Sequence, residues 1–146
     1  MPTYIDTIIA DDARQELGSK VSLYGILGEE MYLAQIPTSL PSFAILQRWR
    51  ISEAEFNAGI QQVSFSLEAP DGQVVNFPQA GAPTLQKGAY VTVMTFILKF
   101  MMFPIRVKGA YKFRTVINGA EKVYTFYVLP TSDMPAPQQK KVGFTG

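Results

Sequence analysis

The feature that most constrains this chain is the dipeptide Asn118-Gly119, which stands between two runs rich in apolar residues. A two-residue type I′ turn needs a positive φ at both central residues, and Asn and Gly adopt that conformation most readily. Before the turn, residues 111–117 alternate between apolar and mostly basic side chains, and after it residues 123–129 are apolar in both alternating rows. The pattern predicts an antiparallel hairpin whose second strand is covered on both faces or lies at an interface.

The rest of the chain supplies further short strands for the same architecture. Apolar runs predict strands near 4–10, 21–25, 31–36, 43–51, 63–67, 74–77 and 91–103. Ser52, with a glutamate three residues later and a closing Gly59, predicts a short helix over 52–59. Tyr111, near the start of the penultimate strand, is typical of immunoglobulin-like domains. We therefore expect an all-β, antiparallel, immunoglobulin-like β-sandwich of about seven strands with one short crossover helix.

The chain is expected to form one domain over residues 1–130, followed by a tail rich in proline, glutamine and lysine over 131–146. Within the domain, the first strand should end at Asp11-Asp12, and residues 13–19 should form a turn that Gly18 stops. Residues 78–89 contain two glycines and two prolines and are expected to form a loop.

The absence of histidine and cysteine removes the residues on which many small enzymes and metal sites depend. The usual general base near neutral pH, the Ser-His relay, thiolate nucleophiles and the common zinc ligands are all missing. The formal net charge is +1 without a basic stripe, which argues against nucleic-acid binding. The longest apolar run is about half a membrane span, and the N-terminus has no signal-peptide pattern. We expect a cytoplasmic, non-enzymatic protein without cofactor or metal, bound to neither nucleic acid nor a membrane.

The first third of the chain carries three short motifs at the expected element boundaries. They are an alanine-aspartate-aspartate start, a glycine-lysine turn and a proline-leucine-proline entry to a strand, here Ala10-Asp11-Asp12, Gly18 with Lys20, and Pro37, Leu40 and Pro41. In these motifs the chain resembles a family of small, uncharacterised bacterial proteins. The resemblance implies a β-sandwich domain of unassigned function and carries over no catalytic residue.

Two arginines form the first part of a candidate interaction surface. Arg48 and Arg50 flank Trp49, and tryptophan and arginine dominate binding hot spots. In the alternative interpretation Trp49 belongs to the core of a central strand, and the two arginines are solvated. Either arrangement leaves the arginines on the outer face of a sheet, where they are available for contact.

Three further residues complete the candidate surface. Phe100 and Met102 lie in a strand that is apolar on both faces, so one row faces the core and the other is covered within the domain or by a partner. Phe144 follows Lys140-Lys141 in the tail, a composition that suits a docking peptide for a partner or a second copy.

Acidic and aromatic residues leave two other possibilities open. The carboxylates at positions 11, 12, 16, 29 and 30 can gather around a calcium ion, or be solvated, with Asp11 or Asp12 accepting bonds from turn amides. Tyr24, Tyr32 and Tyr90 can form a small-ligand or carbohydrate-binding site. Our leading expectation is a non-enzymatic interaction or structural module, with a protein partner or a second copy of itself; the alternative is a small-ligand or carbohydrate-binding sandwich.

Overall fold

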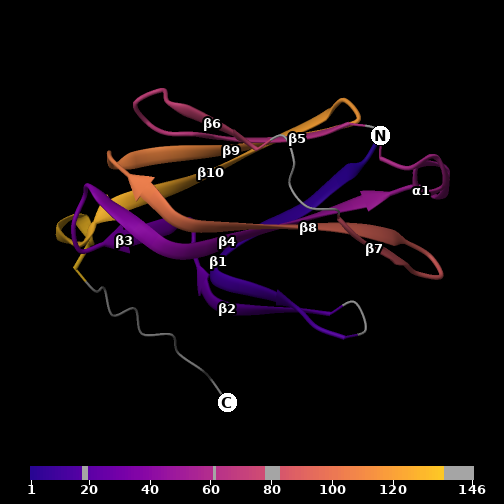
Figure 1. The fold of residues 1–146 in the computed structure, drawn as a ribbon, viewed down its shortest axis with the longest axis horizontal. Helices are drawn as coiled ribbons and strands as arrows, with labels where there is room; N and C mark the ends of the chain where they lie inside the picture. The colour runs from indigo at the N-terminus through magenta and orange to yellow at the C-terminus, as the bar shows by residue number, and fades with distance from the viewer. Residues whose placement is uncertain (18–19, 61, 78–82, 137–146) are drawn as a thin grey trace, which may run out of the picture.

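The computed structural model describes residues 1–17, 20–60, 62–77 and 83–136 (Figure 1). Over these ranges the chain forms ten strands, one α-helix and one 3-10 helix. The strands are β1 (Thr3–Gln15), β2 (Val21–Leu27), β3 (Glu30–Leu33), β4 (Thr38–Ile51), β5 (Val63–Glu68), β6 (Val74–Phe77), β7 (Thr84–Lys87), β8 (Thr92–Ile105), β9 (Gly109–Ile117) and β10 (Ala120–Pro130). The helices are α1 (Glu53–Ala58) and η1 (Thr131–Asp133). No helix within the described ranges is long and apolar enough to cross a membrane.

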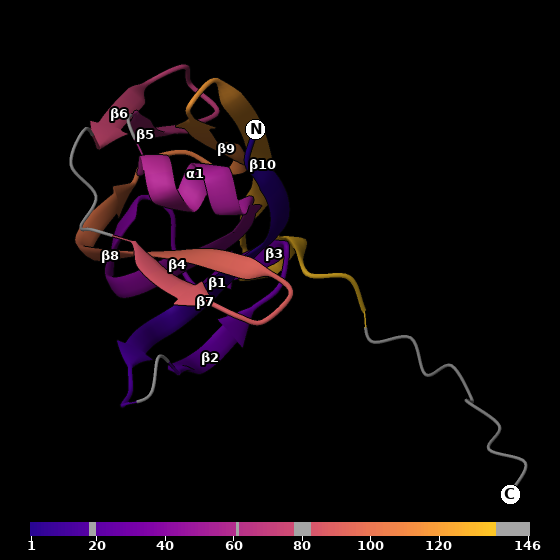
Figure 2. The same cartoon turned by 90° about the vertical axis from the view of Figure 1, so that its right-hand side faces the viewer.

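The strands form two five-stranded sheets that stack as a sandwich (Figure 2). Sheet A has the order β2-β1-β4-β8-β7, and sheet B has the order β3-β10-β9-β5-β6. Neighbouring strands are antiparallel except for β3 and β10, which are parallel. The expected all-β sandwich is confirmed, but the described chain has ten strands where about seven were expected. Nine of the ten correspond to the seven apolar runs and the two hairpin strands that the sequence indicates, and the tenth, the four-residue β7, lies in a segment that was expected to be a loop.

The hairpin predicted around Asn118-Gly119 is confirmed. Asn118 has a φ of 45° and Gly119 a φ of 84°, as a type I′ turn requires, and Ile117 pairs directly with Ala120. The second strand is less covered than its composition suggested. Phe126 and Val128 of its inner row are buried, but Val123 and Tyr127 in the outer row are 36% and 43% exposed.

Aromatic side chains fill the space between the inner faces of the two sheets. Phe65 of sheet B meets Phe96 of sheet A edge-on, with ring centroids 5.1 Å apart, and stacks on Phe113 at 5.7 Å. Trp49 is 2% exposed, so the interpretation that places it in the core is the correct one. These contacts hold the inner faces of the two sheets together, and the outer faces take no part in them.

The short helix between the sheets is also confirmed. The Ser52 side chain accepts a hydrogen bond from the main-chain nitrogen of Glu55, and the Glu55 side chain accepts one from the main-chain nitrogen of Ser52. This reciprocal capping box fixes the first turn, and Gly59 ends the helix with a φ of 79°.

The first strand does not end at Asp11-Asp12 as expected, because β1 continues to Gln15 and pairs with β2 from Ile9 to Gln15. Residues 12–15 of β1 and 21–24 of β2 form a two-stranded arm that lies beneath sheet A, on the side away from sheet B (Figures 1 and 2). Gly25 lies opposite Asp11 at the base of the arm and has a φ of 65°. The aspartates therefore belong to a continuous ladder, and the turn comes later, where the Glu16 nitrogen donates to the Lys20 carbonyl at 2.7 Å.

The loop expected over residues 78–89 contains a strand that the composition did not indicate. Residues Thr84–Lys87 form β7, which pairs antiparallel with β8 from Thr92 to Thr95. The side chains of this segment are largely exposed, so the sequence shows no alternation of apolar and polar residues. Its strand conformation depends on hydrogen bonding to the longer β8.

Candidate functional site

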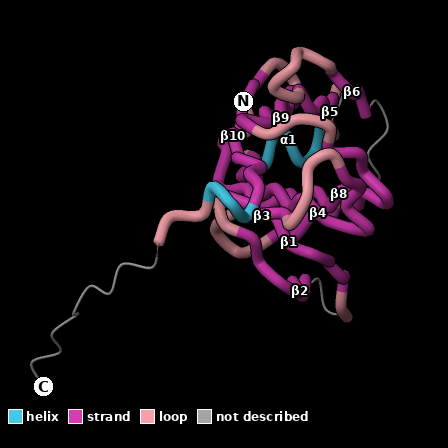
Figure 3. The backbone as a smooth tube through the Cα atoms, turned by 90° about the vertical axis from the view of Figure 1, so that its left-hand side faces the viewer, coloured by secondary structure: helices cyan, strands magenta, loops and turns pink. Residues whose placement is uncertain are grey.

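The outer face of sheet A is partly covered by the chain's own arm. Ala44 and Leu46 of β4 point away from the sandwich core, yet they are 1% and 4% exposed. Ala13 in the arm is fully buried. Lys99 of β8 and Asp12 of the arm form an ion pair of 3.4 Å across this face. The arm is thus held against sheet A by apolar contact and by charge, and forms a partial third layer, seen below β4 in Figure 3.

Beside these contacts, an open groove of about 320 Å³ lies between the arm and sheet A. We call it the arm groove; it is lined by Ile8, Val21, Leu23, Leu46, Arg48, Gln86, Val93 and Thr95. Five of these side chains are aliphatic, and Arg48 is the one charged member. Pockets of this volume whose lining combines apolar side chains with polar groups are typical of binding sites.

Arg48 is positioned by a two-point contact with Asp6 on the neighbouring strand. Its Nε donates to Asp6 Oδ1 at 2.9 Å, and its Nη2 donates to Asp6 Oδ2. The hydrogen bond with Asp6 raises the pKa of the guanidinium, which therefore stays charged. Nη1 makes no hydrogen bond within the described residues, so one side of the guanidinium remains available to an anionic group.

Arg50 connects the arm groove to a second hollow at the end of sheet A, which we call the terminal hollow. It pairs across the strands with Val93, which lines the groove, and it also lines the hollow, whose volume is about 460 Å³. Lys87 and Tyr90 contribute to the same hollow, and Tyr90 is 99% exposed. Among the described residues, neither Arg50 nor Lys87 forms an ion pair. The hollow also contains Glu53 and Glu55, so its charge is mixed.

The structure separates the four described residues of the candidate surface. Arg48 and Arg50 lie together on the outer face of sheet A, as expected for alternate residues of one strand. Phe100 is 7% exposed and stacks on Phe43 with ring centroids 4.5 Å apart. It is part of the core, because it shares the inner row of β8 with Phe96, so it cannot contribute to an accessible surface.

Met102 is exposed, but it is distant from the arginines. Met101 and Met102 are 75% and 64% exposed, and Met102 has a φ of 51° that interrupts the alternation of β8. Met101 pairs with Ser42, whereas Arg50 pairs with Val93 eight residues earlier on β8, about 27 Å along the strand. Phe144 lies outside the described residues.

The two alternative sites, acidic and aromatic, are not assembled in the described chain. No group of three or more acidic, histidine or cysteine residues within it could hold a metal ion. Asp12 instead accepts hydrogen bonds from Arg14 and from the Ala13 nitrogen, and the bond from Arg14 is the main cause that lowers the pKa of Asp12. The tyrosines are also apart. Tyr24 lies under the Arg14 guanidinium, Tyr32 donates to Glu30, and Tyr90 lines the terminal hollow.

The arm itself is what the sequence interpretation missed. Val21 and Leu23 were expected in an ordinary strand, and their contact with the outer face of sheet A depends on the bend beside Gly25. A glycine inside a strand pattern is a recognised sign of a bend or bulge, and this was the available signal.

The architecture and the groove define a two-sheet β-sandwich domain with a covering arm. A comparison with family models matches residues 6–129 to DUF6941, a family of unknown function, and the chain belongs to this family. A comparison with curated proteins finds no match.

Proposed function

We propose that this protein is a non-catalytic binding module that holds an acidic, partly apolar segment of a protein partner in the arm groove. The observation that carries the proposal is the composition of the groove. Aliphatic side chains form most of its lining, Arg48 is its one charged lining residue, and the guanidinium has an unused donor. A carboxylate side chain placed between aliphatic ones complements these features.

We further propose that the sandwich is immunoglobulin-like. The strand order β1-β4-β8-β7 corresponds to the A-B-E-D sheet of such domains, and β10-β9-β5 corresponds to G-F-C. The short parallel pair β3–β10 is compatible with a first strand that changes sheets. Tyr111, near the start of β9, donates to the Val107 carbonyl at 2.7 Å, which is the arrangement of a tyrosine corner. Such sandwiches commonly serve as recognition domains, so this analogy agrees with the proposed role.

An extended protein segment fits the geometry better than a compact molecule. Because Arg50 lies opposite Val93 and also lines the terminal hollow, a segment leaving the groove passes a second guanidinium and then the exposed Tyr90. Arginine and tyrosine are enriched in interfaces because they combine apolar contact with directed hydrogen bonds. The second candidate function is binding of a small amphipathic anion. The observation that favours it is the volume of the groove, which suits a small molecule.

The direct test is selection of random peptides on the immobilised chain of residues 1–146, followed by calorimetry with the selected peptides. We expect sequences in which Asp or Glu is flanked by Leu, Ile or Val. Arg48→Lys keeps the positive charge but loses the planar guanidinium that donates two hydrogen bonds. This variant and Arg50→Ala should each weaken peptide binding about tenfold. Lys112→Ala and Arg114→Ala, on the outer face of sheet B, are matched controls and should leave binding unchanged.

Three outcomes would overturn the proposal. Selected peptides that bind the arginine variants as tightly as the wild-type protein would place the site elsewhere. Binding of dodecanoate that depends on Arg48, without peptide selection, would favour the small-ligand function. A dimer in light scattering that Arg50→Glu converts to a monomer would identify a second copy as the occupant.

A further inference from the structure

A second apolar groove lies at the other end of the sandwich, beside β3, the edge strand of sheet B. It has a volume of about 190 Å³, enough for one large side chain, and we call it the β3 groove. Its lining residues are Asp11, Leu27, Met31, Tyr32, Leu33, Leu40, Ser42 and Phe43. The groove is separate from the arm groove, since the two share no lining residue. Its floor continues into the core, because Phe43 packs against Phe100 and Phe103.

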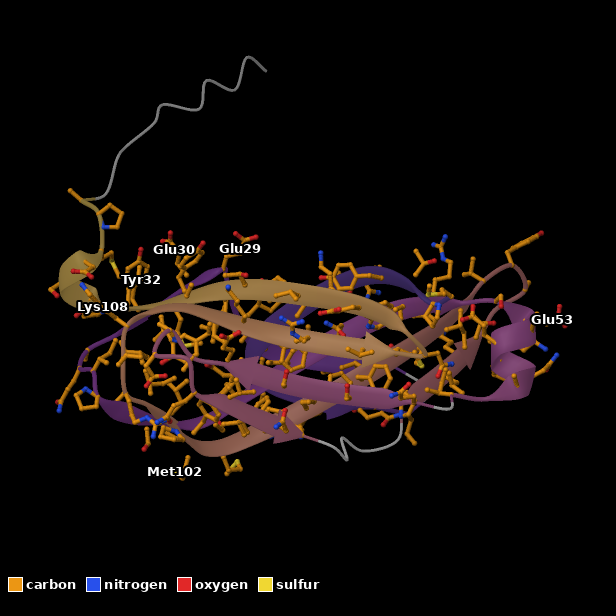
Figure 4. All side chains as sticks on the ribbon, turned by 90° about the horizontal axis from the view of Figure 1, so that it is seen from above. Glu29, Glu30, Tyr32, Glu53, Met102 and Lys108 are labelled. Atoms are coloured by element: carbon orange, nitrogen blue, oxygen red, sulfur yellow. The ribbon has the colours of Figure 1, made fainter. Side chains whose placement is uncertain are left out.

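The rim of the β3 groove is acidic. Glu29 and Glu30 are exposed, and neither forms an ion pair with a described residue. Tyr32 donates to Glu30, and this hydrogen bond, with the charges of Glu30 and Asp133, raises the pKa of the Tyr32 hydroxyl. Figure 4 shows Glu29, Glu30 and Tyr32 at the same end of the molecule as Lys108. Asp11 adds a further carboxylate to the lining. A cationic and partly apolar occupant complements this surface.

The end of the described chain comes close to this groove. Pro130 pairs with Leu33, which lines the groove, and η1 follows directly, beside β3 in Figure 3. The Lys108 ammonium group lies 3.0 Å from Asp133 of η1 and forms an ion pair with it. Ten residues follow Ala136, with the sequence PQQKKVGFTG, two lysines, no acidic residue, and Phe144 eight positions beyond Ala136. An extended chain of eight residues reaches about 26 Å, so Phe144 can reach the groove of its own molecule.

We propose that residues 137–146 dock in the β3 groove of the same chain, with Phe144 in the apolar pocket and Lys140 and Lys141 beside Glu29 and Glu30. The phenyl ring extends the aromatic cluster of Phe43, and the lysines balance a rim that otherwise has no cationic partner in the described chain. Because the tail is covalently attached to the domain, its docking in the β3 groove is favourable even if the free segment binds weakly. A short linker gives an effective concentration of about 1 mM, so a segment whose free Kd is about 0.1 mM is about 90% docked. A partner that uses this groove must displace the tail.

The experiment uses the full chain and its lack of cysteine. A spin label on a cysteine introduced as Thr145→Cys broadens the amide signals of residues near the end of the tail. We expect broadening concentrated at Met31, Tyr32, Leu33 and Leu40, with at least a fivefold contrast to β5 and β6. The matched control carries the same label with Phe144→Ser, Lys140→Glu and Lys141→Glu, and should lose this contrast. The proposal is overturned if the broadening is uniform over the surface, or if the contrast persists in the control.

A mixed sample separates docking within one chain from exchange between two. Spin-labelled protein without isotope is combined with isotope-labelled protein that has no spin label. Docking within the chain predicts no broadening at β3 in this mixture. Broadening there would show that the tail docks on a second copy, which contradicts docking within one chain. Glu29→Lys with Glu30→Lys, both exposed, should abolish the contrast in the first experiment without affecting the fold.

Discussion

The hydroxyl group of Tyr111 donates a hydrogen bond of 2.7 Å to the main-chain carbonyl oxygen of Val107, four residues earlier. Val107 belongs to the connection that takes the chain from β8 in sheet A to β9 in sheet B. Because Tyr111 is 2% exposed and its ring stacks on Phe126, the hydrogen bond ties this connection to the core of sheet B. The crossing between the sheets is therefore fixed by one side chain.

Tyr111→Phe should keep the fold and lower the free energy of unfolding by about 1–2 kcal/mol, because the Val107 carbonyl loses its partner while the ring still packs. Urea unfolding followed by tryptophan fluorescence measures the change. Tyr127→Phe, at a position that is 43% exposed, is the matched control and should change stability by less than about 0.5 kcal/mol. Equal stabilities for wild type and Tyr111→Phe would show that the bond makes no net contribution.

Alkaline pH should destabilise the protein through three tyrosines that are partly or fully buried. Burial is the main cause that raises the pKa of Tyr4, Tyr111 and Tyr124 above the ordinary value of 10.0. A folded-state pKa above the unfolded value stabilises the fold fully below about pH 10, and this stability is lost as pH rises through the folded pKa. Unfolding free energies at pH 8 to 12 should therefore decline above pH 10, less steeply in Tyr111→Phe. Stability that stays constant to pH 12, with all tyrosines ionising near pH 10, would contradict the prediction.

A buried chain of hydrogen bonds joins β1 and β4 on the inner face of sheet A. The Gln47 amide donates to Thr7 Oγ1 at 3.0 Å, and its carbonyl accepts from Trp49 Nε1 at 2.8 Å. Gln47 is 0% exposed, so Gln47→Leu leaves the indole N–H and the Thr7 hydroxyl with fewer partners in the core. We expect a loss of about 2–4 kcal/mol in unfolding free energy, measured by thermal and urea denaturation. A loss below about 1 kcal/mol would mean that water or rearrangement replaces the lost partners.

Thr115 is as buried as Gln47, but we expect its substitution to leave the unfolding free energy unchanged or to raise it. Its side chain is 0% exposed on the inner face of β9, and its hydroxyl has no hydrogen-bond partner among the residues that the structure describes. Thr115→Val keeps the shape and removes the unsatisfied group, so stability should stay equal or rise by up to about 1 kcal/mol. The same denaturation assays compare it with Gln47→Leu. A clear destabilisation by Thr115→Val would indicate a partner for the hydroxyl in solution.

The sequence predicted the features that local residues determine. Asn118-Gly119 predicted the hairpin, Ser52 with Glu55 predicted the short helix, and one of the two interpretations of Trp49 placed it in the core. The missed features depend on contacts between distant segments. β7 needs the ladder of β8, and the contact of Val21 and Leu23 with sheet A needs the bend of the arm. Phe100 was misjudged because a strand that is apolar in both rows does not reveal which row faces inward. Of the candidate surface, the sequence located the arginines and missed the groove that surrounds them.

Gly25 is the residue on which the shape of the arm groove depends. Its φ of 65° favours glycine, and a Cβ built at this position would lie 2.2 Å from Asp11 Oδ2. Gly25→Ala should therefore lower the unfolding free energy by about 1–2 kcal/mol and loosen the arm. Hydrogen exchange should accelerate at residues 12–15 and 21–24 while the amides of β9 and β10 remain protected.

Gly28→Ala is the matched control, because no atom lies within 4 Å of a Cβ built there and its φ is outside the left-handed region. It should leave stability and exchange unchanged. Asp11→Ala combined with Gly25→Ala separates the two causes, since it removes the carboxylate and keeps the backbone strain. If the double variant regains part of the stability, contact with Asp11 contributes to the cost; if it regains none, the positive φ accounts for it. Normal arm protection in Gly25→Ala would show that the bend does not require glycine.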